Sequence, residues 1–126
     1  MQNIQEFYPQ YSQTIINKLT ELQQLIWQVA NEQGTTLSES AKWGQLSFAA
    51  KKGTPIRIDQ FSDNQIALLV HCQTTLIENW KALFPQQLTF SGNRAVLLSI
   101  DSPLPAAELA VCIAMALNYH ASNKSR

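Results

Sequence analysis

Charge is scarce in this sequence, and the little that is present cancels. Charged residues make up 14% of the 126 residues, whereas a typical domain has about 25%. Nine basic residues balance nine acidic ones, and the sequence has no basic cluster to neutralise phosphates, so we expect no nucleic-acid partner. A net charge near zero gives little repulsion between copies of the chain, which permits a homodimer.

Cysteine and long apolar runs are also scarce. Cys72 and Cys112 form no Cys-x-x-Cys pair, so they carry no zinc signature, and we expect both to be reduced and buried. The longest apolar run, residues 109–117, is far shorter than the ~20 residues of a membrane span. Residues 1–6 have neither a basic start nor an apolar stretch, so we expect no signal peptide and a cytoplasmic location.

Apolar residues make up 45% of the chain, and they recur with a helical period in two segments. Steps of three and four from Ile15 to Val29 predict an amphipathic helix over residues 9–33, which Gly34 ends in a left-handed conformation. A second apolar stripe follows Pro105 and predicts the last helix.

Between these helices the period changes to that of strands. Thr75 to Glu78 has the pattern of a capping box and predicts a short helix there. Alternating or fully apolar runs predict five strands, near residues 45–48, 56–59, 66–70, 88–90 and 94–100.

These elements predict an α+β fold in a single domain over residues 1–126. We expect a five-stranded antiparallel sheet with the N- and C-terminal helices packed on one face and the short helix between strands 3 and 4. The core should span about residues 8–120, with a frayed tail over residues 121–126.

The sheet face that points away from the helices carries the candidate site. Because side chains alternate between the two faces, one apolar set should face the helices: Phe48, Ile56, Ile58, Leu68, Val70, Val96 and Leu98. The opposite face should carry Trp43, Gln45, Ser47, Arg57, Asp59, Leu69, His71 and Leu97. Residues with stacking or anion-binding chemistry form the predicted ligand site: Trp43, Arg57, His71 and Arg94. An ordinary solvated face is the alternative.

This site predicts binding rather than catalysis. Its occupant would be a small anion or other small molecule, a protein or peptide, or a second copy of the chain. His71 and Cys72 adjoin, but neighbours in a strand point to opposite faces, so we expect no catalytic pair from them. The sequence has no standard catalytic motif, and we expect it not to be an enzyme.

Several short blocks of the sequence resemble the YdhG-like family of bacterial domains of unknown function. These blocks are Lys42-Trp43-Gly44-Gln45, Gly53-Thr54-Pro55-Ile56-Arg57, His71-Cys72-Gln73-Thr74-Thr75-Leu76, Gly92-Asn93-Arg94-Ala95 and Pro103-Leu104-Pro105. The likeness covers roughly residues 8–120. It implies an α/β sandwich related in shape to frataxin, with both terminal helices on one face of an antiparallel sheet.

The same resemblance implies an alternative function, a frataxin-like iron chaperone with iron as its cargo. The candidate iron ligands are Glu21, Glu32, Glu39, Asp59 and His71. Frataxins carry many carboxylates on the first helix and the first strand, whereas glutamines stand in their place here. We therefore place a binding module without a resident cofactor first and the iron chaperone second.

Overall fold

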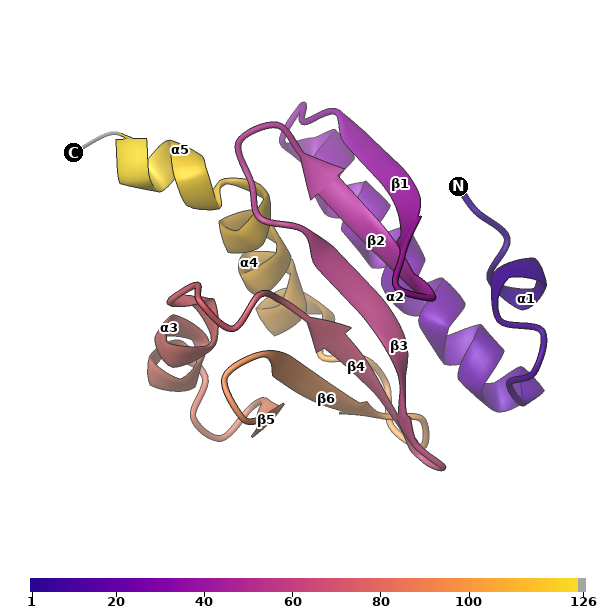
Figure 1. The fold of residues 1–126 in the computed structure, drawn as a ribbon. Coiled ribbons are helices and arrows are strands. Elements are labelled where there is room, and N and C mark those ends of the chain that lie inside the picture. The colour runs from indigo at the N-terminus through magenta and orange to yellow at the C-terminus, as the bar shows by residue number, and fades with distance from the viewer. Residues whose placement is uncertain (125–126) are drawn as a thin grey trace.

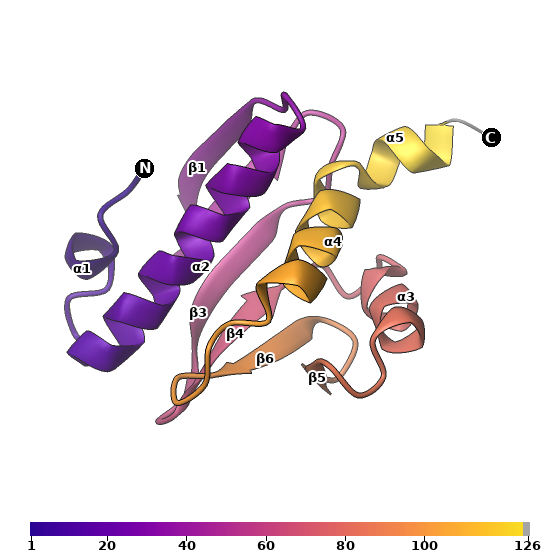
Figure 2. The same cartoon turned by 180° about the vertical axis from the view of Figure 1, so that it is seen from behind.

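Figure 1 shows the computed structural model, which describes residues 1–124 and the side chains of residues 1–121. Its elements are α1 (Ile4–Phe7), α2 (Gln13–Glu32), β1 (Leu37–Lys42), β2 (Gln45–Ala50), β3 (Ile56–Ser62), β4 (Gln65–Leu69), α3 (Leu76–Leu83), β5 (Thr89–Ser91), β6 (Ala95–Ser99), α4 (Ala106–Leu117) and α5 (Tyr119–Lys124). The strands form one antiparallel sheet in the order β1-β2-β3-β4-β6-β5. Helices α2 and α4 cover one face, and no described element crosses the other (Figures 1 and 2). The predicted α+β class is therefore confirmed.

The predicted number of strands is wrong, because the sheet has six strands and the sequence predicted five. The extra strand is β1, which pairs with β2 along its whole length, up to Lys42 opposite Gln45. Only Trp43 and Gly44 lie between them, with φ angles of 56° and 75°. Two successive positive φ angles are typical of a type I′ hairpin turn. The strand escaped prediction because Leu37 is its only buried residue, and because Trp-Gly is not the usual Asn-Gly turn signal.

The face of the sheet toward the helices is apolar, as predicted. All of the residues expected there are buried: Phe48, Ile56, Ile58, Leu68, Val70, Val96 and Leu98. Cys112 on α4 is buried among them, and burial raises the pKa of its thiol to about 12. Cys72 is only partly buried, so that part of the prediction is wrong. The reason is that β4 ends at Leu69, and the chain has left the sheet before Cys72.

The first long helix is shorter than predicted. α2 begins at Gln13 rather than at Pro9, because Ser12 caps it by accepting the Ile15 N–H at 3.3 Å. Gly34 follows the end of the helix with a φ of 64°, as its position in the sequence predicted.

The last helix divides in two. α4 ends at Leu117, and after Asn118 the chain continues as α5. Of the predicted frayed tail, residues 121–124 belong to α5, and residues 125–126 lie outside the described part of the chain. No helix within residues 1–124 combines the length and the apolar character needed to cross a membrane.

Helix α3 forms where predicted, but without the predicted capping box. The Thr75 N–H, which Glu78 was expected to reach, donates to the hydroxyl of Tyr119 at 3.2 Å. The Thr75 side chain makes no capping hydrogen bond. The Leu76 N–H lies 3.5 Å from the hydroxyl of Thr74 instead. A hydrogen bond to Tyr119 of α5 has therefore taken the place of the predicted capping box.

Tyr8, between α1 and α2, ties the N-terminal segment into the sheet. Its side chain is buried, and its hydroxyl accepts the Leu46 N–H at 2.9 Å and donates to the Ile58 carbonyl at 2.6 Å. Leu46 and Ile58 are register partners in β2 and β3, so the hydroxyl bridges the two strands. Burial raises the pKa of this hydroxyl above its ordinary value.

Candidate functional site

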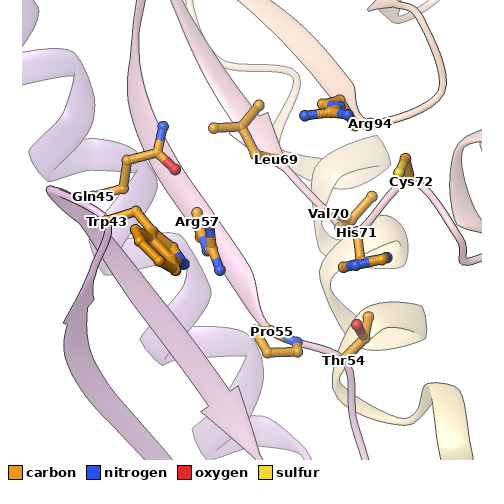
Figure 3. Close-up of a pocket in the computed structure, with 10 residues that line it drawn as sticks. All are labelled: Trp43, Gln45, Thr54, Pro55, Arg57, Leu69, Val70, His71, Cys72 and Arg94. Atoms are coloured by element: carbon orange, nitrogen blue, oxygen red, sulfur yellow. The ribbon is translucent and has the colours of Figure 1, made fainter.

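A hollow of about 450 Å³ lies on the sheet face that the helices leave uncovered (Figure 3). Four segments surround it: the β1–β2 turn with the start of β2, the start of β3, the end of β4, and the start of β6. The residues that line it are Trp43, Gln45, Thr54, Pro55, Arg57, Leu69, Val70, His71, Cys72 and Arg94. The structure therefore brings together the four residues of the predicted ligand site.

Strand pairing places the two arginines on opposite sides of β4. Arg57 on β3 is the register partner of Leu69. On the other side, the Val70 N–H donates to the Arg94 carbonyl at 2.8 Å. The amide of Asn93 holds the next turn by donating to the carbonyl of Cys72 at 3.3 Å. Backbone pairing thus fixes the positions from which the Arg57 and Arg94 side chains extend.

A tight turn after β4 positions His71. The His71 carbonyl accepts the Thr74 N–H at 3.1 Å and the Thr74 hydroxyl at 2.8 Å. Its ring Nδ1 accepts the Gln73 N–H at 3.1 Å. A neutral imidazole with Nδ1 as acceptor carries its proton on Nε2. His71 can therefore offer a hydrogen-bond donor to a ligand even when it is uncharged.

The same turn overturns one expectation about His71 and Cys72. Alternation along a strand predicted that these two side chains would point to opposite faces. Both line the hollow, because β4 ends at Leu69 and the strand rule no longer applies after it. Cys72 is therefore a lining residue that the sequence interpretation missed. The break in the apolar run after Val70 is the signal that marked the end of the strand.

Thr54, Pro55 and Val70 are the other lining residues that the sequence interpretation missed, and the last helix places the first two. The Thr54 N–H donates to the Ala116 carbonyl of α4 at 2.9 Å. Thr54 is 5% exposed, yet its hydroxyl makes no hydrogen bond within the described residues. No local sequence pattern predicts this position, because it depends on packing against the far end of the chain.

The two arginines of the hollow have no acidic partner in the part of the chain that the structure describes. Within the described residues the one ion pair joins Lys18 and Glu21 on α2, at 3.6 Å. Neither the Arg57 nor the Arg94 guanidinium makes a hydrogen bond with a described residue. No carboxylate lines the hollow. The site therefore presents two guanidinium groups that form no ion pair with any described residue.

Asp59, the nearest acid along β3, makes its hydrogen bonds with other residues and forms no ion pair with Arg57. Its carboxylate accepts the hydroxyl of Tyr11 at 2.5 Å, the amide of Gln45 at 3.0 Å and the N–H of Gln60 at 2.8 Å. These donors stabilise the carboxylate without any help from Arg57. Burial raises the pKa of Tyr11, and the hydrogen bond to Asp59 raises it further.

The five candidate iron ligands do not come together. Glu21 pairs with Lys18, and Glu32 accepts the amide of Gln28 at 3.4 Å. Among the described residues, no three histidines, cysteines or carboxylates are grouped so that they could hold a metal ion.

Glu39, another of the five candidate iron ligands, has a structural role. Its carboxylate accepts the indole N–H of Trp27, the amide of Gln23 at 3.3 Å and the N–H of Gln2 at 2.9 Å. These contacts join the edge strand to α2 and to the N-terminal segment.

Comparison with known proteins adds no family to this description. No protein-family model matches the chain, and neither the curated proteins nor the solved structures yield a match.

Proposed function

We propose that the chain is an intracellular, non-catalytic binding domain that holds a small anion, a carboxylate or a phosphate, in the hollow on the open sheet face. The absence of any acidic partner for Arg57 and Arg94 among the described residues carries this proposal. The two free cysteines support a reducing location.

The chemistry of the lining fits an oxyanion. A guanidinium presents a planar fork of N–H donors that matches the two oxygens of a carboxylate or phosphate. Nε2 of His71 and the unpartnered hydroxyl of Thr54 supply further donors at the same hollow. Charge-assisted hydrogen bonds of this kind are about twice as strong as neutral ones.

We propose that the chain is related to the YdhG-like family and has the frataxin-like shape that this resemblance implies. Four of the blocks that carry the resemblance supply most of the lining of the hollow, among them Trp43, Arg57, His71 and Arg94. We propose that a shared binding site underlies the likeness. The scattered carboxylates give no support to iron as the cargo.

Titration with inorganic phosphate and with acetate, followed by NMR shifts of backbone amides, tests the proposed site. The substitutions Arg57→Gln and Arg94→Gln should each weaken binding about tenfold or more, because each removes a charged hydrogen bond. Lys42→Gln is the matched control, since it removes one positive charge from an exposed residue near the hollow that does not line it.

Equal weakening by all three substitutions would show that only net charge matters, and the site would be rejected. Undetectable binding of either anion at millimolar concentration would reject it as well. If the chain then sediments as a dimer, a second copy of the chain becomes the favoured occupant among those that the sequence permits.

A further inference from the structure

We infer that the ligand of this hollow is an aromatic anion, a planar ring that stacks on Trp43 and carries the phosphate or carboxylate that Arg57 and Arg94 hold. The inference rests on the proposed function and adds the class of ligand. Two sources of this chemistry, a nucleotide and an aromatic carboxylic acid, are separated by the experiment below.

Trp43 contributes nothing to the core. It is 90% exposed, the most exposed of the large apolar residues described. Within the described residues it makes no ring contact, hydrogen bond or cation–π contact. The other tryptophans behave differently: Trp80 is fully buried, and the indole N–H of Trp27 donates to Glu39.

The backbone at Trp43 is unfavourable for a large side chain. Its φ of 56° lies in the left-handed region, and no other non-glycine residue of the described chain has a positive φ. Asparagine or glycine adopts this conformation at far lower cost, which is why they dominate type I′ turns. Tryptophan here therefore destabilises the fold through both backbone strain and exposed apolar surface, and no contact with a described residue offsets either effect.

A ligand bound beside the arginines would offset the strain and the exposure of Trp43. Its indole lines the same hollow as Arg57 and Arg94, and Figure 3 shows it on the Arg57 side. A ring on the indole would therefore lie near the Arg57 guanidinium, with Arg94 across β4 at the other side of the hollow. Aromatic faces and guanidinium planes are the platforms on which proteins stack planar ligands.

The size and floor of the hollow agree with a ring-bearing ligand. A volume of about 450 Å³ falls within the range of roughly 300–1,000 Å³ for small-molecule sites and greatly exceeds the volume of a bare phosphate. Pro55 and Leu69 supply an apolar part of the lining, whereas a simple inorganic anion needs no apolar contact. The lining thus divides into cationic and apolar parts, as an amphiphilic ligand requires.

Matched pairs of probes test the inference. Adenosine 5′-monophosphate is compared with ribose 5-phosphate, and 2-naphthoate with cyclohexanecarboxylate, by calorimetry on the full chain. In at least one pair the aromatic member should bind about tenfold or more tightly, as base–aromatic stacking provides. The pair that shows the preference identifies the source.

Trp43→Asn then separates a ligand role from a structural one. Asparagine suits a φ of 56°, so this variant should unfold at the same temperature as the parent chain or a higher one. It should lose the aromatic preference and keep its affinity for ribose 5-phosphate. Trp43→Phe, which retains an aromatic face, should keep part of the preference.

The two proposals fail in distinguishable ways. If anions bind but the aromatic and non-aromatic probes bind equally well, the stacking inference is overturned and the anion site stands. Retention of the full aromatic preference in Trp43→Asn also overturns it. If none of the four probes binds, both proposals are rejected together.

Discussion

At the scale of single residues, two tyrosine hydroxyls hold the N-terminal segment to the sheet. Tyr8 bridges β2 and β3, and Tyr11 donates to Asp59. Their rings stack with centroids 5.0 Å apart. Each hydroxyl acts as a donor and can do so only while it is protonated. The attachment of this segment therefore depends on pH.

Alkaline pH should destabilise the fold through these tyrosines. Burial raises the pKa of both hydroxyls in the folded chain, whereas in the unfolded chain they ionise near pH 10. Their contribution is therefore complete below about pH 10 and is lost as pH rises from there through the folded pKa. Urea unfolding measured from pH 8 to pH 12 should show this loss, and Tyr11→Phe should reduce it. An identical pH dependence in the variant would contradict the assignment to Tyr11.

The two cysteines should differ in reactivity toward iodoacetamide. Cys112 is buried, and its thiol pKa is raised to about 12, so little of the reactive thiolate forms near pH 8. Cys72 is partly exposed at the hollow. Mass spectrometry of the native chain should show alkylation at Cys72 first and at Cys112 only with unfolding. A ligand in the hollow should slow the first reaction, and faster alkylation of Cys112 would contradict the packing described.

At the scale of elements, the turn between β2 and β3 meets the end of α4 at Gly53. A Cβ placed on Gly53 would lie 2.6 Å from the carbonyl oxygens of both Ala116 and Leu117. Backbone oxygens cannot rotate away as a flexible side chain can. Gly53 is thus the point where the lining residues Thr54 and Pro55 depend on the last helix.

Gly53→Ala should therefore lower the free energy of unfolding by about 1–3 kcal/mol, the range for an overpacked contact. It should also weaken anion binding, because Thr54 would move with the turn. Gly44→Asn is the control, since nothing lies within 4 Å of its Cβ position and asparagine tolerates its φ of 75°. Urea denaturation measures the stability of both variants. Equal stabilities would show that the end of α4 shifts to make room for the added Cβ.

The elements also differ in how far the sequence predicted them. β2, β3, β4, β5 and β6 were predicted because alternating or fully apolar runs mark them in the sequence. β1 was not, because an edge strand with one buried residue has almost no pattern. The capping box at Thr75 failed for another reason, since Tyr119 took the N–H that Glu78 would have bound.

The same distinction applies to the candidate site. Arg57 and Leu69 follow from alternation along strands, which is a local rule, and the sequence placed both on the outer face. Thr54 depends on α4, and Cys72 depends on the end of β4, so neither could follow from a local rule. The exposure of Trp43 also could not be predicted, because it depends on a turn that the sequence did not predict.

At the scale of the whole molecule, the two faces of the sheet separate the residues of the core from those of the proposed binding site. One face carries the apolar core and both long helices, and the other carries the hollow with its unpaired arginines. Residues that would unfold the chain and residues that would bind a ligand therefore lie on opposite sides. This separation is what makes Arg57, Arg94 and Trp43 suitable for substitution experiments.

The strand order has a consequence for synthesis of the chain. β4 pairs with β6, and β5 reaches the sheet only through β6. On the ribosome, the apolar residues 66–69 of β4 are therefore made well before β6, their second partner strand. Until β6 pairs with it, β4 presents an open strand edge to which other chains can bind. The β5–β6 hairpin seals that edge only after α3 and the loop behind it have been made. A nascent chain thus stays vulnerable to aggregation until its sixth strand has left the exit tunnel.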